Sequence, residues 1–204
     1  MLPVTSGTIS VGGSDITHAP AHEICRTGLA RTFQNIRLLS EATVLENVLV
    51  GFHRHETSST LSALLGLRDA GAETRTLRER TLSLLDEFGL REFADYPASG
   101  LSYGHQRILE IGMGLAQNPR LFILDEPTQG LAEAEVEDFN TLIKTLDAET
   151  TILLIEHNMN VVMAVAEYIT VLDQGMVLAN GTPEEIRANA AVQEAYLGTG
   201  HGRS

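Results

Sequence analysis

The chain has 204 residues, of which 43% are hydrophobic and 20% are charged, a balance typical of a folded globular protein and not of a disordered one. Its 27 acidic residues outnumber its 14 basic residues and give a formal net charge of −13, which argues against a protein that coats nucleic acid or binds an anionic membrane surface. The single cysteine excludes an intramolecular disulfide.

The first elements along the chain are short. Residues 8–11 predict a strand that ends in a turn at Gly12-Gly13, and residues 23–30 predict a helix. Residues 31–37 are expected to form a connecting loop that leads into a more helical part of the chain.

Helical signals fill the middle of the chain. Thr43 and Glu46 have the spacing of a capping box, so a helix is expected to begin there and to continue to Phe52. Residues 55–72 are rich in Ser, Gly, Thr and His and predict a mobile or variable loop. Residues 73–88 show the apolar stripe of a second helix, and a third is expected to begin at Ser102.

Strands and helices then alternate. The expected strands are 121–124, 151–155, 169–172 and 176–179, and the expected helices are 133–146, 158–167 and one beginning at Thr182-Pro183. This alternation predicts an α/β fold with a parallel core, into which the preceding helical stretch is inserted as a lobe.

Two adjacent carboxylates, Asp125 and Glu126, follow the apolar strand that ends at Leu124. Ligands of open α/β sheets gather at the carboxyl ends of strands, and neighbouring carboxylates repel unless a cation lies between them. One carboxylate for Mg²⁺ and a second that orients water is the arrangement that phosphoanhydride hydrolysis requires. The alternative to such a site is that the two carboxylates only cap the loop that follows the strand.

Three further segments supply polar groups. The N-terminus of the helix after Ser102 has Gly104 in its first turn, which leaves backbone N–H groups open to an anion, although a simply capped helix also fits. His157 follows the strand 151–155 and would reach the same sheet edge as Asp125 if the two strands are neighbours. The alternative is that His157 is a hydrogen-bonded structural residue. Gln34 has amide atoms that can reach a metal or its water, but alone it indicates little.

Taken together and in this order, the four segments resemble the ATP-binding cassette (ABC) ATPases. Gln34 matches the Q-loop, LSYGHQR the signature motif, LFILDEP the Walker B strand with its following glutamate, and His157 the switch histidine. The phrases GLARTFQNIRL, TVLENVLV, ILLIEHNM and ANGTPEEIR are similar to the ATP-binding subunits of branched-chain amino acid importers, although related importers of urea or short amides have similar ATPases.

The resemblance implies a P-loop NTPase-type ABC ATPase core with an inserted α-helical subdomain. Residues 1–38 would be a part of the core that ends in the Q-loop, residues 39–118 the helical subdomain, and residues 119–204 the α/β core with Walker B, D-loop, switch histidine and C-terminal helices.

The resemblance also implies roles for individual residues, with ATP and Mg²⁺ as cofactors. Asp125 would hold Mg²⁺ and Glu126 would polarise the attacking water. His157 would contact the γ-phosphate, and Gln34 would reach the metal and relay the nucleotide state to the membrane subunits. The signature residues that would complete the nucleotide site of a partner subunit are Ser102, Tyr103, Gly104 and Gln106.

The phosphate-binding loop of the family, G-x-x-x-x-G-K-[ST], does not occur in the sequence. The only lysine, Lys144, lies in an expected amphipathic helix. We therefore expect that N-terminal strands and the P-loop are missing from this chain, through truncation, a gene-model error or degeneracy, and that the chain alone hydrolyses ATP negligibly. A non-catalytic subunit that lends only its signature face to a partner is the alternative function.

The implied partners are a second ABC ATPase subunit, identical or related, transmembrane permease subunits and, indirectly, a solute-binding protein. Neither a membrane-spanning apolar run nor an export signal is present in the sequence, so we expect a cytoplasmic chain held on the inner face of the membrane by the permease. Nucleic acid is not an expected partner, because a DNA-maintenance ATPase of this superfamily would need a long coiled coil before the signature motif.

Overall fold

The protein is described by a computed structural model, which covers residues 4–32, 36–52, 72–146 and 150–198. The chain forms two compact units, Met1–Ile155 and Glu156–Ser204, each with its own apolar core. Among the described residues, no helix combines the length and apolar character needed to cross a membrane. The three-part division predicted from the sequence stays a prediction.

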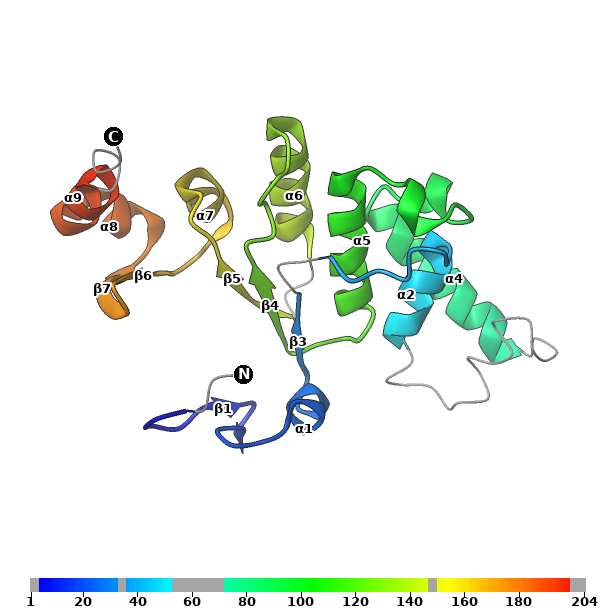
Figure 1. The fold of residues 1–204 in the computed structure, drawn as a ribbon, viewed down its shortest axis with the longest axis horizontal. Coiled ribbons are helices and arrows are strands. Elements are labelled where there is room, and N and C mark those ends of the chain that lie inside the picture. The colour runs from blue at the N-terminus through cyan, green and yellow to red at the C-terminus, as the bar shows by residue number, and fades with distance from the viewer. Residues whose placement is uncertain (1–3, 33–35, 53–71, 147–149, 199–204) are drawn as a thin grey trace. The chain divides into compact units, whose positions relative to one another are not determined.

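A parallel sheet in the order β3-β4-β5 lies in the first unit (Figure 1). The strands are β3 (Leu29–Arg31), β4 (Leu121–Asp125) and β5 (Thr151–Ile155). Phe122 and Leu124 are fully buried on one face of β4, whereas Leu153 and Ile155 of β5 are 48% and 46% exposed. The predicted α/β fold with parallel strands is therefore confirmed, and β4 rather than β5 is its buried strand.

The helix predicted over residues 23–30 is wrong in its second half. α1 is Ala21–Arg26, and Gly28 turns the chain with a φ of 95° before Leu29 enters β3. The carbonyl of Gly28 accepts hydrogen bonds from the backbone N–H groups of Arg120 (2.8 Å) and Leu121 (3.1 Å), which aligns β3 with β4. Arg31 consequently belongs to a strand and not to the predicted loop, because pairing with a distant strand overrides the local helical preference.

The strand predicted over residues 8–11 forms part of a small hairpin. β1 (Ser10–Val11) pairs antiparallel with β2 (Ser14–Asp15). Gly12 and Gly13 have φ values of 56° and 80°, the positive values that a two-residue type I′ turn requires. The predicted turn is confirmed, and the strand is shorter than predicted.

Helices between β3 and β4 form the main apolar core of the first unit, where α2 packs on α4 and α5 (Figure 1). Among the described residues of this unit, the helices after α1 are α2 (Val44–Phe52), α4 (Ala72–Glu87), α5 (Tyr103–Leu115) and α6 (Glu133–Thr145), with short 3₁₀ turns η1 (Arg91–Phe93) and η2 (Ala98–Gly100). Each predicted helix of the lobe is thus confirmed. The loop predicted over residues 55–72 lies outside the described residues up to residue 71, and Ala72 already belongs to α4.

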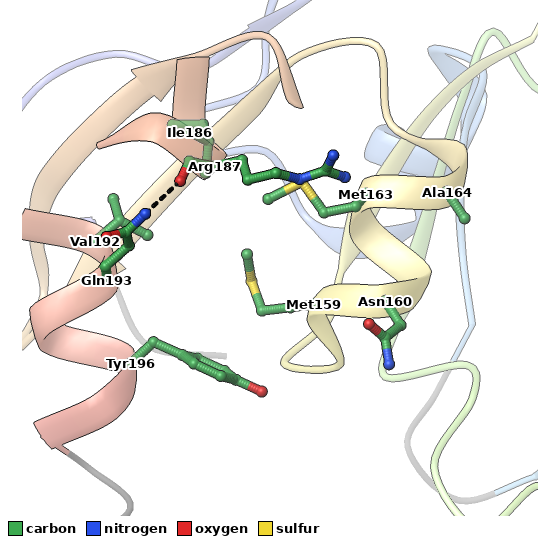
Figure 2. Close-up of a pocket in the computed structure, with 9 residues that line it drawn as sticks. All are labelled: Met159, Asn160, Met163, Ala164, Ile186, Arg187, Val192, Gln193 and Tyr196. Atoms are coloured by element: carbon green, nitrogen blue, oxygen red, sulfur yellow. Dashed lines mark hydrogen bonds between the residues drawn. The ribbon is translucent and has the colours of Figure 1, made fainter. Parts of the chain in front are cut away.

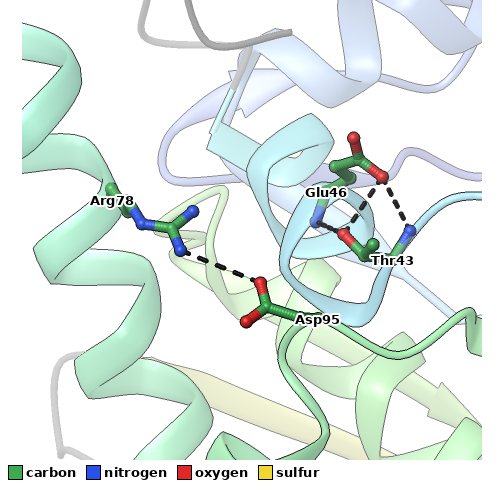
Figure 3. Close-up of polar contacts among 4 residues, drawn as sticks. All are labelled: Thr43, Glu46, Arg78 and Asp95. Carbon is green, nitrogen blue, oxygen red and sulfur yellow. Dashed lines mark hydrogen bonds and ion pairs between the residues drawn. The ribbon is translucent and has the colours of Figure 1, made fainter. Parts of the chain in front are cut away.

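The predicted capping box begins α2 (Figure 3). The Thr43 N–H donates to Glu46 Oε2 (2.7 Å), and the Glu46 N–H donates to Thr43 Oγ1 (3.1 Å). Nearby, Arg78 of α4 pairs with Asp95 at 3.8 Å; both side chains are exposed, so water screens the pair and its contribution to stability is small.

In its described residues, 156–198, the second unit has a hairpin and three helices. Its elements are α7 (Met159–Val165), β6 (Ile169–Asp173), β7 (Met176–Gly181), α8 (Pro183–Ala188) and α9 (Ala190–Gly198). β6 and β7 pair antiparallel, so the predicted parallel arrangement does not extend to them. The Thr182 and Glu185 side chains each accept the other's backbone N–H at the start of α8, as the sequence predicts.

Candidate functional site

The carboxylate pair follows β4 at an abrupt change of chain direction. Asp125 is the last residue of β4 and pairs with Ile155 of β5, while Glu126 has a φ of 47°, in the left-handed region that residues other than glycine rarely adopt. The Glu126 N–H donates to the Ile155 carbonyl (2.9 Å), and the Glu126 carbonyl accepts from the Gln129 N–H (3.2 Å). These bonds hold a strained conformation at the end of a buried strand, a combination common at functional sites.

Asp125 is bound from the neighbouring strand. Its Oδ2 accepts a hydrogen bond from Arg31 Nη2 at 2.7 Å, and its backbone N–H donates to Thr32 Oγ1 at 3.2 Å. The sequence placed Arg31 next to the predicted Gln34 but gave no reason to single it out. Gln34 itself lies outside the described residues.

The donor chemistry at Asp125 fits Mg²⁺. Carboxylate oxygens are the ligands that Mg²⁺ prefers, and it is usually held by one or two carboxylates together with water and phosphate oxygens. The Arg31 guanidinium on Asp125 already shows that a cation is attracted to this position. Within the described part of the chain, no group of three or more His, Cys, Asp or Glu side chains is placed to hold a metal ion.

The N-terminus of α5 is capped as predicted. Ser102 Oγ accepts a hydrogen bond from the His105 N–H (3.2 Å), and Gln106 Nε2 donates to the Leu101 carbonyl (3.0 Å). Ser102 and Tyr103 are exposed, and the N-terminus of this 13-residue helix is a position that favours anions.

The first turn of α5 lies against the loop that follows the carboxylates. A Cβ on Gly104 would collide with the carboxylate of Glu135 in α6, and one on Gly130 would lie 3.2 Å from the Tyr103 ring. Glu135 is itself fixed, because its Oε2 accepts the Ala132 N–H at 2.9 Å. The structure therefore brings the predicted signature residues Tyr103 and Gly104 beside the segment 130–135, which follows Asp125 and Glu126 in the chain.

A buried ion pair supports this turn, and the sequence reasoning missed it. Arg107 is fully buried; its Nη1 lies 2.8 Å from Glu110 Oε2, and its Nη2 donates to the Tyr103 hydroxyl at 3.4 Å. The Arg107 side chain thereby orients Tyr103 from within the helix. The only available signal was the spacing of Tyr103, Arg107 and Glu110 on one helical face.

His157 belongs to the second unit. Its side chain is 72% exposed, whereas that of Glu156 is 1% exposed, and Glu156 Oε2 accepts the backbone N–H groups of His157 (3.0 Å) and Asn158 (3.2 Å). The predicted adjacency of the preceding strands is confirmed, since β4 pairs with β5. That His157 acts together with Asp125 and Glu126 stays a prediction.

The second unit also contains a cavity of about 520 Å³ between α7, α8 and α9 (Figure 2). Its lining is Met159, Asn160, Met163, Ala164, Ile186, Arg187, Val192, Gln193 and Tyr196. Ile186 and Val192 are buried, and Gln193 Nε2 donates to the Arg187 carbonyl at 2.7 Å on the rim. None of the predicted site residues lines this cavity.

Two protein-family models match the sequence. The model described as ABC transporter matches residues 1–129, and the model described as branched-chain amino acid ATP-binding cassette transporter matches residues 176–202.

Curated relatives match along nearly the whole chain. The chain is 44% identical over 196 residues to the high-affinity branched-chain amino acid transport ATP-binding protein BraF of Pseudomonas aeruginosa, a match that covers 95% of this chain and 77% of BraF. It is 42% identical over 196 residues to LivG of Escherichia coli K12, whose name describes the same transport function, with the same coverage.

Solved structures share the fold. The ADP conformation of MJ1267, an ATP-binding cassette of an ABC transporter, superposes with a TM-score of 0.77 at 30% identity and covers 97% of this chain and 79% of that one. A dimeric structure of the ATP-binding cassette MJ0796 bound to ADP and Pi gives a TM-score of 0.68 at 25% identity, covering 88% of this chain and 74% of that one.

Proposed function

The chain belongs to the ATP-binding domains of the ABC transporter family, and from this premise we propose that it is the energy-coupling subunit of an importer for branched-chain amino acids. One observation carries the proposal: the chain that is similar to BraF over 95% of its length also ends its buried central strand at Asp125, with Glu126 directly after it. BraF and LivG are both described as branched-chain amino acid transport proteins, which favours this solute class over urea or short amides.

The proposal gives Asp125 and Glu126 separate tasks. Asp125 holds Mg²⁺, which when bound neutralises charge on the phosphates, and Gln34 reaches the same ion or its water. Glu126 accepts a proton from the attacking water, and its fixed backbone supports this task because a general base must be held within hydrogen-bond reach of the proton it takes. His157 donates a hydrogen bond to the γ-phosphate.

The signature residues serve the nucleotide of a second ATPase subunit. The exposed Ser102 and the N-terminus of α5 bind the phosphates, while Tyr103, Gly104 and Gln106 shape this surface. The dimeric MJ0796 structure, bound to ADP and Pi, supports such pairing. The pair acts with transmembrane permease subunits at the inner face of the membrane and, through them, with a solute-binding protein.

A second candidate function is favoured by the sequence itself, which has no G-x-x-x-x-G-K-[ST] motif. The exposed Lys144 lies near the end of α6 and does not substitute for the P-loop lysine. In this alternative the chain is a non-catalytic subunit that contributes only its signature face. For Glu126 to act, a P-loop has to hold the phosphates, and the 204 residues do not contain one. Sequencing the DNA upstream of the Met1 codon separates the two, since an in-frame P-loop favours the enzyme.

The solute is tested by deleting the gene in the cell that carries it. We expect the uptake of labelled leucine, isoleucine and valine to fall to background and to return when the gene is restored, with labelled urea uptake unchanged. Normal leucine uptake in the deletion strain would contradict the proposal. A selective loss of urea uptake would show that urea, and not a branched-chain amino acid, is the solute.

A further inference from the structure

The carboxylate assigned to the metal is already bound by a cation of the same chain. Arg31 Nη2 and Asp125 Oδ2 lie 2.7 Å apart, although 94 positions separate the two residues in the sequence. The Arg31 side chain is 47% exposed and that of Asp125 is 24% exposed, so the pair lies at the surface edge of the sheet. Arginine stays charged at every physiological pH, so the pairing does not depend on the protonation of the guanidinium.

The backbone delivers Arg31 to this position. β3 and β4 are parallel neighbours with Arg31 opposite Ile123, two residues before Asp125. Ala30 and Thr32 are buried on either side of the exposed Arg31, and Thr32 Oγ1 accepts the Asp125 N–H at 3.2 Å. Because both strands are fixed by this register, the guanidinium can leave Asp125 only by rotation of its side chain.

We propose that Arg31 is a positioning residue that serves as the counter-ion of Asp125 and, by competing for its carboxylate, lowers the affinity of Asp125 for a divalent cation. This inference rests on the proposed function, because it takes Asp125 to be the metal ligand. Arg31 orients the carboxylate and offsets its charge, and it has to release Oδ2 before Asp125 can bind a metal fully. Arg31 lies three positions before Gln34, so this release occurs on the segment that leads into the Q-loop.

The size of the effect follows from the exposure of the pair. Partly exposed ion pairs contribute modestly because water screens them, and removing one is expected to change a competing equilibrium by about two- to fivefold. Arg26 on α1 offers a matched control, since it is exposed and its removal changes the net charge equally without touching Asp125.

The test is a Mn²⁺ titration of the purified 204-residue chain, with free Mn²⁺ measured by electron paramagnetic resonance. The variants are Arg31→Gln and Arg31→Ala, which remove the charge, Arg31→Lys, which keeps it, and the control Arg26→Ala. Asp125→Asn, alone and combined with Arg31→Gln, defines which part of the Mn²⁺ binding belongs to Asp125. Circular dichroism is used to confirm that each variant is folded. If one of the two neutral variants of Arg31 does not fold, the other is enough for the test.

We expect the neutral variants to tighten the Asp125-dependent Mn²⁺ binding about two- to fivefold, with Arg31→Lys close to the wild type and Arg26→Ala changing it less. Unchanged or weaker Mn²⁺ binding in the neutral variants, or an equal gain in Arg26→Ala, would overturn this inference and leave the proposed function untouched. If Asp125→Asn removes no Mn²⁺ binding even from the Arg31→Gln protein, the metal role of Asp125 fails, and with it both this inference and that part of the proposed function.

Discussion

At the scale of single residues, Ser102 caps a helix and is also the residue proposed to bind a phosphate. Its Oγ accepts the His105 N–H and caps α5, and its exposed position is the one proposed to face a phosphate. Asp and Asn both cap helices as well as Ser does, so substitution by either keeps the helix, and only Asp adds a negative charge.

Ser102→Asp is therefore expected to reduce leucine uptake at least about tenfold, because its carboxylate repels the phosphates, while Ser102→Asn keeps most of the uptake. The measurement is labelled leucine uptake in cells that carry each variant at equal protein levels. Transport at the wild-type rate by Ser102→Asp would remove the anion-binding role of this helix terminus.

The sequence could identify individual site residues but not their contacts. Asp125, Glu126 and Ser102 stand out because their positions follow from a strand end and a helix start, which are local patterns. The bond between Arg31 and Asp125 depends on the pairing of β3 with β4, which no local pattern contains. Arg107 was overlooked because arginine is rarely fully buried unless it is paired, and its partner Glu110 becomes evident only in the folded helix.

At the scale of secondary-structure elements, close packing of α5 depends on its glycines. A Cβ on Gly114 would collide with the Phe122 ring of β4, and a Cβ on Gly112 would lie 2.8 Å from Phe88. Both aromatic side chains are buried, so they have little room to move.

Gly114→Val is expected to lower the free energy of unfolding by about 2 kcal/mol, because overpacking of a filled core costs more than the small gain in helix propensity. The control is Gly100→Val at an exposed position with no atom within 4 Å of its Cβ, where a change below about 0.5 kcal/mol is expected. Urea denaturation of both variants is the measurement, and equal effects would show that α5 is not packed as described.

Elements with strong local signals were predictable, and those defined by distant pairing were not. β4, the start of α5 and both ends of α6 were predicted within one or two residues because an apolar run, a cap and an amphipathic stripe mark them. The helix over residues 23–30 was predicted too long because β3 has only three residues. These residues form a strand only because they pair with β4, which lies far away in the sequence. The exposure of β5 was also unexpected, since its apolar sequence is typical of a buried strand.

At the scale of the whole molecule, the 204 residues contain no G-x-x-x-x-G-K-[ST] motif, and we propose that they supply only part of the chemistry of ATP hydrolysis. Positioning and charge stabilisation provide most of the catalysis of phosphoryl transfer, and a general base alone contributes about 10²- to 10⁴-fold. The purified 204-residue chain is therefore expected to release phosphate from labelled ATP no faster than an Asp125→Asn variant. Turnover of about 1 s⁻¹ or more, which is ordinary for an enzyme, would show that the chain holds the phosphates without a P-loop.

The most direct test of the energy-coupling role is leucine uptake by cells in which the gene carries Glu126→Gln. Glutamine keeps the size of the side chain but cannot accept the proton from water, so uptake is expected to fall at least about a hundredfold. Glu137→Gln on α6, an exposed position with the same change of charge, is the matched control and should transport normally. Normal uptake with Glu126→Gln would contradict the account and favour a subunit that contributes no catalysis of its own.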